Sequence, residues 1–171
     1  MLRSNPLRFH QQLGCRAGQS WHWDGVDFKF LHPQAEQTSG GNNRSCVLQV
    51  RVGGYTILLP ADIERAAETQ LVAQYGDKLK SHVLIAPHHG SKTYSSQAFI
   101  EQVSPDMVLI ANGYRNRYRF PHHTVTSRYQ NQGISWLETQ YSGAISVLIR
   151  PNGLSEPIRW REKLRRYWHS Q

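Results

Sequence analysis

The sequence predicts one α/β domain built on a mixed β-sheet. Two strand-like segments, 45–52 and 55–59, flank Gly53-Gly54, which is the pattern of a β-hairpin with a tight turn. Further along, the apolar runs 82–86 and 106–111 are separated by a segment with helical spacing, which is typical of βα units with parallel strands. A chain of 171 residues with 39% hydrophobic and 19% charged residues is large enough to bury one core.

Shorter signals predict the remaining elements. Segment 21–25 indicates a strand that runs into an Asp-Gly turn, and 26–31 alternates apolar and polar residues like a half-buried strand. Helical spacing predicts a helix over 63–75, and Ser95 is placed to cap a helix that ends at Val103. The other predicted elements are a short helix at 6–13, a helix at 124–132 stopped by Gly133, strands at 134–138 and 144–150, and a basic terminal helix at 158–168.

Composition excludes several classes of protein. The apolar runs are far shorter than the roughly 18 residues that a membrane-spanning helix needs, so no such helix is expected. No apolar segment follows Met1-Leu2-Arg3-Ser4, so no signal peptide is expected either. The composition is that of a globular chain and not of a disordered one.

The charge of the chain is positive and unevenly distributed. The formal net charge is +8, and from residue 103 onward ten Lys and Arg stand against four Asp and Glu. A surface of this kind attracts polyanions, nucleic acid first. The alternative is a solvated basic face that aids solubility.

The two cysteines, Cys15 and Cys46, are 31 positions apart and neither belongs to a Cys-x-x-Cys pair. A disulfide between them would require an oxidising compartment. Because Cys46 begins an apolar strand-like run, we expect a buried free thiol.

Asp62 follows the predicted strand 55–59 and has two interpretations. A carboxylate at the rigid end of a buried strand is well placed to bind a metal ion. It is equally placed to cap the helix that follows.

The second candidate site is His88-His89-Gly90-Ser91, directly after the apolar run 82–86. A neutral imidazole binds zinc or manganese, and adjacent side chains point apart, so one histidine of the pair is expected to bind and the other to position a substrate. Gly90 allows a close backbone approach. The alternative is a histidine pair on the surface or in the core.

A third candidate is the segment Tyr118-Arg119-Phe120-Pro121-His122-His123. Arginine next to aromatic side chains is the chemistry of a nucleic-acid contact, through phosphate pairing and base stacking. The alternative is a stabilised surface loop. Asn43-Arg44-Ser45, at the start of a strand, would orient a ligand or form a simple turn.

Taken together, these blocks resemble the C-terminal metallo-β-lactamase-like domain of ComEC-type competence proteins, the DNA-uptake channels of the inner membrane. The resemblance covers about residues 21–150, and its blocks occur in the order of the family. They are Phe30-Leu31-His32-Pro33, Asn43-Arg44-Ser45-Cys46-Val47-Leu48, Leu58-Leu59-Pro60-Ala61-Asp62-Ile63-Glu64, Ala86-Pro87-His88-His89-Gly90-Ser91-Lys92-Thr93, Asn116-Arg117-Tyr118, Pro121-His122, and Thr139 through Gly143-Ala144-Ile145.

The resemblance implies roles for individual residues. Asp62 corresponds to a carboxylate able to bridge two metals and His88 to a histidine ligand, with His89 beside it as a third catalytic residue. Asn43 looks like a site asparagine, and His122 like the second histidine of a Gly-His-Pro-His segment. The residues expected to contact substrate or DNA are Asn43, Ser91, Lys92, Arg117, Tyr118, His122, Arg161, Lys163, Arg165 and Arg166.

Three departures from the family pattern limit what this chain is expected to do. Pro60-Ala61 replaces the usual Thr-Gly before the aspartate, and Phe120 stands where the family often has a histidine. The His- and Asp-rich metal motif, which lies upstream of Trp21 in that fold, is absent. We therefore expect a single metallo-β-lactamase-like αββα sandwich over 1–171 that is incomplete at its N-terminal side, with 151–171 as a basic extension.

The activity implied by the resemblance is metal-dependent phosphodiester hydrolysis, in natural transformation, of the DNA strand that is not imported. Its cofactor would be Zn or Mn in the full domain, and its partners would be DNA, the upstream half of the domain and the membrane channel. The expected location is the periplasmic face, as a soluble domain of an inner-membrane protein. With about two ligands left, the chain alone is expected to bind metal weakly or not at all and to be inactive. The alternatives are a non-catalytic DNA-binding module and a hydrolase of a small anionic substrate.

Overall fold

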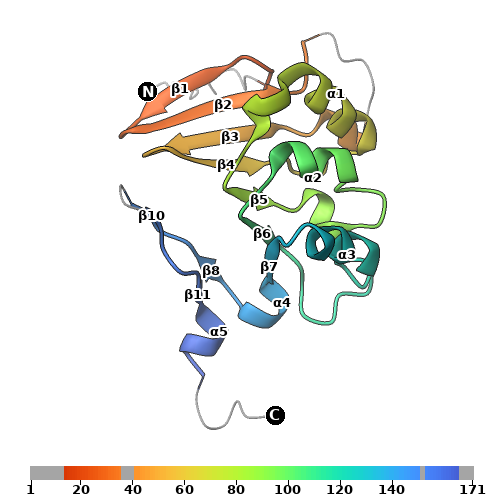
Figure 1. Cartoon of the computed structure of the whole chain (residues 1–171), viewed down its shortest axis with the longest axis vertical. Helices are drawn as coiled ribbons and strands as arrows, with labels where there is room; N and C mark the ends of the chain where they lie inside the picture. The colour runs from red at the N-terminus through yellow and green to blue at the C-terminus, as the bar shows by residue number, and fades with distance from the viewer. Residues whose placement is uncertain (1–13, 36–40, 151–152, 166–171) are drawn as a thin grey trace, which may run out of the picture.

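The computed structural model describes residues 14–35, 41–150 and 153–165, and these form a seven-stranded mixed sheet with helices on one face (Figure 1). The strands lie in sequence order, β1 to β7. The predicted α/β class is confirmed. The helix predicted at 6–13 lies outside the described residues.

The first half of the sheet is antiparallel, as the two turn signals predict. Asp24-Gly25 joins the first hairpin and Gly53-Gly54 the second, and both glycines of the second turn have positive φ (+56° and +87°). The strands are β1 (Ser20–Trp23), β2 (Val26–His32), β3 (Val47–Val52) and β4 (Tyr55–Leu59), and a short 3-10 helix, η1 (Gly41–Arg44), precedes β3.

The second half is parallel and contains three crossover connections. From β4 onward each strand pairs in parallel with the next, and a helix lies between each pair. The strands are β5 (Val83–Ile85), β6 (Met107–Ile110) and β7 (Ser135–Glu138). The helices are α1 (Arg65–Tyr75), α2 (Gln97–Val103) and α3 (His123–Asn131), with 3-10 turns η2 (Gly76–Leu79) and η3 (Pro87–Gly90).

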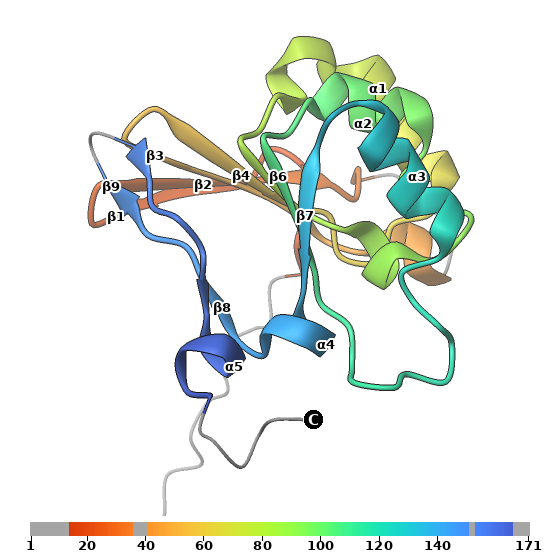
Figure 2. The same ribbon diagram turned by 60° about the horizontal axis from the view of Figure 1, so that its bottom comes forward.

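The core lies between the parallel strands and the three helices, which cover the same face of the sheet (Figure 2). Leu58, Leu84 and Val108 point into it from the strands, and Phe99 and Tyr129 from the helices; all five are fully buried. Because strand side chains alternate between the two faces, their neighbours lie on the opposite face. These neighbours, including Phe28, Phe30, Leu48, Ile57, Leu59, Ile85 and Leu109, are apolar but only half-buried.

A buried carboxylate joins the helices, and the caps of α1 and α2 differ from the two that were predicted. Glu68 of α1 is fully buried and accepts hydrogen bonds from the backbone N–H groups of Ser95 (2.7 Å) and Ser96 (2.8 Å). Since Glu68 takes these donors, α2 begins with Ser96 as its N-cap, and not with Ser95. The N-cap of α1 is Glu64, so Asp62 does not cap that helix.

The C-terminal segment differs from its prediction. The expected strand 144–150 is divided between β8 and β9, because each pairs with a different partner further along the chain. The expected helix 158–168 begins only at Trp160, because Ile158 and Arg159 pair with β8; residues 166–168 lie outside the described residues. The elements are α4 (Thr139–Ser142), β8 (Ile145–Ser146), β9 (Ile149–Arg150), β10 (Gly153–Leu154), β11 (Ile158–Arg159) and α5 (Trp160–Lys163).

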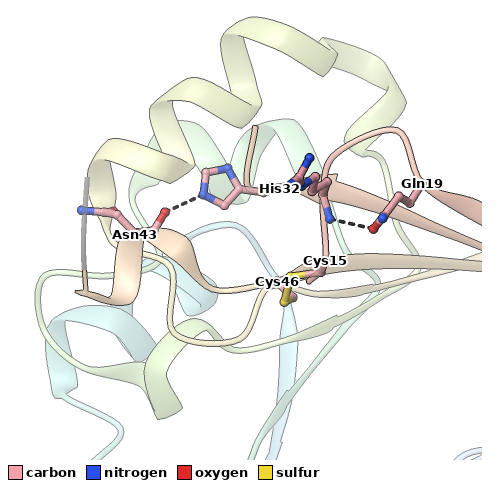
Figure 3. Close-up of a disulfide and its surroundings, with 6 residues drawn as sticks. Cys15, Gln19, His32, Asn43 and Cys46 are labelled. Atoms are coloured by element: carbon pink, nitrogen blue, oxygen red, sulfur yellow. Dashed lines mark hydrogen bonds between the residues drawn. A yellow bond between two sulfur atoms is a disulfide. The ribbon is translucent and has the colours of Figure 1, made fainter. Parts of the chain in front are cut away.

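Cys15 and Cys46 form a disulfide (Figure 3) with their Cα atoms 5.9 Å apart. The expectation of a free thiol at Cys46 is therefore wrong. The segment before β1 runs beside β2, where the N–H of Ala17 donates to the carbonyl of Pro33 (2.8 Å) and that of Gly18 to Phe30 (2.9 Å). This path carries Cys15 to the start of β3.

Replacing Glu68 with alanine is expected to destabilise the fold by about 3 kcal/mol, because two buried N–H groups lose a charged acceptor. The free energy of unfolding from urea denaturation measures the effect. Glu101→Ala is the matched control, since Glu101 is exposed on α2 and its loss should cost less than about 0.5 kcal/mol. Equal losses in the two variants would show that Glu68 does not join the helices as described.

Candidate functional site

Three loops meet at the edge of the sheet where the parallel strands end. They follow β4, β5 and β6, and backbone hydrogen bonds connect them in turn. The N–H of His88 donates to the carbonyl of Ala61 (3.1 Å), and the N–H of His122 donates to the carbonyl of Gly90 (2.8 Å). The backbones on either side of Asp62, at His88 and at His122 are thus brought to one edge.

The backbone of this edge is strained. His88 (φ 44°, ψ 44°), His89 (φ 58°, ψ 20°) and Ala61 (φ 51°) all lie in the left-handed region. A residue other than glycine held there costs about 1–3 kcal/mol and persists only where its surroundings fix it, often at functional sites.

Gly90 has to be glycine because another chain segment lies against it. Its φ is +79°, and a Cβ built there would lie 2.7 Å from the Cβ and 3.2 Å from the Cα of Pro121. Such a clash involves backbone and could not be relieved by a side-chain rotation. The absence of a side chain at Gly90 lets the segment that carries His122 pack against the histidine loop, so the predicted close approach is found.

The imidazole of His88 is half-buried, and one of its two nitrogens is not hydrogen-bonded to any described residue. Its ring lies edge-on to Tyr94, with centroids 4.4 Å apart, and 6.1 Å from that of Phe120. Its Nδ1 atom is buried and has no hydrogen-bond partner among the residues that the structure describes. Buried imidazole nitrogens are normally hydrogen-bonded, and in the tautomer with its proton on Nε2 this one would present a lone pair to a cation. His89 is exposed, and its ring lies edge-on to that of His88 with the centroids 6.1 Å apart.

The described residues do not make a complete metal site. Asp62 is half-buried beside the His88 loop, so the two donors come from adjoining segments. Over the described part of the chain, no three His, Cys, Asp or Glu side chains are grouped to hold an ion. A catalytic zinc normally has three protein ligands. We therefore assign no reaction step to a metal held by this chain alone.

His122 is the N-cap of α3, which the sequence did not predict. Its Nδ1 accepts a hydrogen bond from the N–H of Thr124 (3.3 Å) and contacts the Thr124 hydroxyl (2.9 Å). Desolvation, followed by the positive charges of His123, Lys92 and Arg128, lowers the pKa of His122 from the usual 6.5. The lowering by these neighbouring cations indicates that the surface around His122 is positively charged.

Asn43 is fixed to the start of α1 and to the core. Its Nδ2 donates to Oε2 of Glu64 (2.8 Å), and its carbonyl accepts a bond from Nε2 of the fully buried His32 (2.7 Å; Figure 3). Sequence reasoning did not select His32 or Glu64. The only signal was that both fall within stretches that match the family.

A cavity of about 600 Å³ opens between the histidine loop and the β6 loop. It is lined by His88, His89, Ala111, Asn112, Gly113, Asn116, Tyr118 and Phe120. Asn116 shapes its wall, because its Oδ1 accepts from the N–H of Phe120 (2.8 Å) and its Nδ2 donates to the Phe120 carbonyl (2.9 Å). The ring of Tyr118 stacks on that of Phe120, with centroids 5.5 Å apart. The guanidinium of Arg117 lies 4.7 Å from the centroid of the Tyr118 ring. Of the residues predicted to contact DNA, Tyr118 therefore lines this cavity and Arg117 packs against the Tyr118 ring.

The remaining predicted contacts are spread over two places. The N–H of Ser91 donates to the carbonyl of His88 (3.1 Å), and Lys92 next to it is exposed. Arg161 lies farther away on α5, where it donates to the carbonyl of Gln140 and its guanidinium lies 6.0 Å from the Tyr114 ring. Lys163 is exposed at the end of α5, and Arg165 is exposed just after it. Arg166 lies outside the described residues.

Ala61→Gly is expected to stabilise the protein by about 1 kcal/mol, because glycine adopts the left-handed conformation without strain. Chemical denaturation measures the change. Ala73→Gly, on the exposed side of α1, should have the opposite sign and destabilise by about 1 kcal/mol. A destabilised Ala61→Gly variant would contradict the strained backbone at residue 61.

The ring of His122 is expected to titrate with a midpoint below 6.5, measured from its ring proton shifts by NMR. Since the folded state favours the neutral ring, the contribution of His122 to stability is present above pH 6.5 and is lost as pH falls through the lower pKa of the folded state. His123→Gln should raise the midpoint by removing a like charge. A midpoint above 6.5 would contradict the positive surroundings.

Comparison with known proteins finds much longer bacterial relatives, a competence protein among them. No family model matches the chain. It is 43% identical over 146 residues to competence protein ComA of Neisseria gonorrhoeae, covering 85% of this chain and 21% of the relative. It is 37% identical over 133 residues to recombination protein 2 of Haemophilus influenzae (78% and 16%), and 34% identical over 120 residues to ComE operon protein 3 of Bacillus subtilis (70% and 15%).

Among solved structures, a Thermotoga maritima protein described as a Zn-dependent hydrolase of the metallo-β-lactamase superfamily aligns over 66% of this chain and 55% of its own. The identity is 12% and the TM-score 0.38, so only a loose superposition of part of the fold is seen. The sequence relatives carry the assignment. This chain spans about a fifth or less of their length, and it is homologous to the C-terminal region of the ComEC-type competence proteins.

Proposed function

We propose that this chain is part of a metal-dependent phosphodiesterase domain of a DNA-uptake protein, which hydrolyses the DNA strand that is not imported during natural transformation. One observation carries the proposal. The strained loop that holds His88, whose Nδ1 has no partner among the residues that the structure describes, is hydrogen-bonded to the loop that holds Asp62. The homology to competence proteins supports the same reading.

In this proposal the chain contributes two metal donors, Asp62 and His88, and His89 positions the substrate from the adjoining cavity. The remaining ligands for Zn or Mn come from other residues of the full-length protein. Divalent metals in such hydrolases activate a water molecule and polarise the phosphoryl group. The described residues alone do not complete the site, so this chain is expected to be inactive by itself.

The apolar sheet face is the surface proposed to receive the upstream half of the domain. Phe30, Leu48 and Leu59 are register partners across β2, β3 and β4, and Ile85 and Leu109 continue the surface over β5 and β6. All five are only half-buried, although the other face of the sheet is covered by three helices. Since a wide apolar surface of this kind normally packs against a partner, a second sheet would complete the sandwich.

The proposed location is the periplasmic face of the inner membrane. The Cys15–Cys46 disulfide supports it, because disulfides persist in oxidising compartments such as the bacterial periplasm. In the part of the chain that the structure describes, no helix has the length and apolar character needed to cross a bilayer. A membrane channel would thus be contributed by other parts of the protein.

A non-catalytic DNA-binding module is the second candidate. It is favoured by the finding that the described residues contain no group of three metal-binding side chains. In that case the basic surface would remain functional and Asp62 and His88 would not bind a metal in any context.

Calorimetric titration with Mn²⁺ or Zn²⁺ distinguishes the metal-dependent phosphodiesterase from the non-catalytic DNA-binding module. Binding should be weak for this chain alone and tight for a longer protein of the family that includes the upstream half. In the longer protein, Asp62→Asn and His88→Gln should weaken binding strongly and abolish DNA hydrolysis. Asp106→Asn is the matched control, because this exposed carboxylate lies before β6, at the opposite edge of the sheet.

Two outcomes would overturn the assignment. Tight binding of two ions to the 171-residue chain would show that the ligand set has been misread. Unchanged metal affinity in Asp62→Asn and His88→Gln variants of the longer protein would leave the non-catalytic module as the better explanation.

A further inference from the structure

A second cavity, of about 610 Å³, is lined in part by Tyr94, the residue whose ring contacts His88. Three parts of the chain form it: the start of α1, the segment that follows the histidine loop, and α3. Three cationic side chains, Arg65, Lys92 and Arg128, line this cavity, and Glu64 is the carboxylate in its wall. Its volume is within the range of ligand-binding pockets.

One of the cations is held firmly in place. Arg128 is half-buried, and its Nη1 donates to the carbonyls of Tyr94 (2.9 Å) and Ser95 (3.0 Å). These bonds fix the guanidinium at the cavity wall without neutralising its charge. Its five N–H donors exceed the two that these carbonyls use.

The other two cations have no opposite charge to satisfy them. Arg65 and Lys92 are exposed, and neither forms an ion pair within the described parts of the chain. Glu64, whose Oε2 accepts from Nδ2 of Asn43 (2.8 Å), is the one carboxylate in the lining and stands against three cations. The cavity therefore keeps an excess of positive charge, and the ligand that matches it is an anion.

The position of the cavity identifies the anion. The ring of Tyr94 contacts His88 edge-on at 4.4 Å, and the same residue lines the cavity and binds Arg128 through its carbonyl. Lys92 follows the turn in which the N–H of Ser91 donates to the carbonyl of His88. The cavity and the histidine loop are therefore neighbours that share Tyr94, so a phosphodiester chain bound at His88 would have this cavity beside it.

We propose that the cavity is a subsite for a backbone phosphate of the DNA strand, next to the phosphate at Asp62 and His88. The proposal rests on the function proposed above and adds Arg65 and Arg128 to the DNA-contacting residues. Arginine and lysine recognise phosphate by charge-assisted hydrogen bonds, and the hydroxyls of Thr93 and Ser96 in the lining suit the same ligand. Contacts of this kind hold the strand in register and do not read its sequence.

Fluorescence anisotropy with a labelled single-stranded oligonucleotide tests the subsite in the 171-residue chain. The measurement is made in EDTA, so that it does not depend on a metal. Arg65→Gln and Lys92→Gln should each weaken binding several-fold and reduce the slope of log Kobs against log salt by about 0.7, the value for one phosphate contact on a single strand. Arg51→Gln and Lys29→Gln are matched controls, since both residues are exposed on β2 and β3, away from the cavity.

The outcomes separate the subsite from the proposed catalytic function. Reduced slopes in the cavity variants and an unchanged slope in the controls would support it, even if no metal-dependent hydrolysis were ever found. Equal slopes in all four variants would overturn it, as would a wild-type chain that does not retain the oligonucleotide. Binding of inorganic phosphate by the cavity without retention of the oligonucleotide would show a site for a small anion and would also overturn it.

Discussion

The arrangement of the helices depends on the short segment from Tyr94 to Ser96. Glu68 of α1 accepts the N–H groups of Ser95 and Ser96. From α3, Arg128 donates to the carbonyls of Tyr94 and Ser95, and the hydroxyl of the buried Tyr129 donates to Oγ of Ser95 (2.9 Å). Burial raises the pKa of Tyr129 to about 12, so this hydroxyl remains a donor at any physiological pH. Three helices are thereby joined at one point, which in turn fixes the loops that carry His88 and His122.

Much of the sheet could be predicted because its signals are local. Gly53-Gly54 and Asp24-Gly25 specify turns through their own backbone preferences, and the apolar runs at 82–86 and 106–111 specify buried strands. The cap at Ser95 was wrong because a distant carboxylate, Glu68, accepts the N–H groups of Ser95 and Ser96. The cap at Asp62 was wrong because α1 begins two residues later, with Glu64 as its N-cap. The long terminal helix was wrong because pairing between β8 and β11 competes with the helical spacing of Trp160 and Leu164.

The candidate site, too, could be predicted where its signals are local and not where they depend on distant contacts. A side chain that follows a buried strand can be located from sequence, which is why Asp62 and His88 were selected. The partners that hold such residues in place cannot be located from sequence, because Glu64, His32 and Arg128 act through contacts with segments far along the chain. Cys15 and Cys46 belong to this second group, since their pairing depends on the path of the segment before β1. Strain is also hidden from sequence: nothing local requires His88 and His89 to be left-handed.

The bond between Cys15 and Cys46 closes a loop of 31 positions that contains the whole first hairpin. In the chain-entropy description, closing a loop of this length restricts the unfolded chain by about 3.5 kcal/mol. That is a large part of the 5–15 kcal/mol by which domains are typically stable, and its loss would raise the unfolded population by a factor of several hundred. The redox poise of the surrounding solution therefore changes the stability of this polypeptide. In a reducing cell interior the same sequence would unfold far more often than in an oxidising compartment outside it.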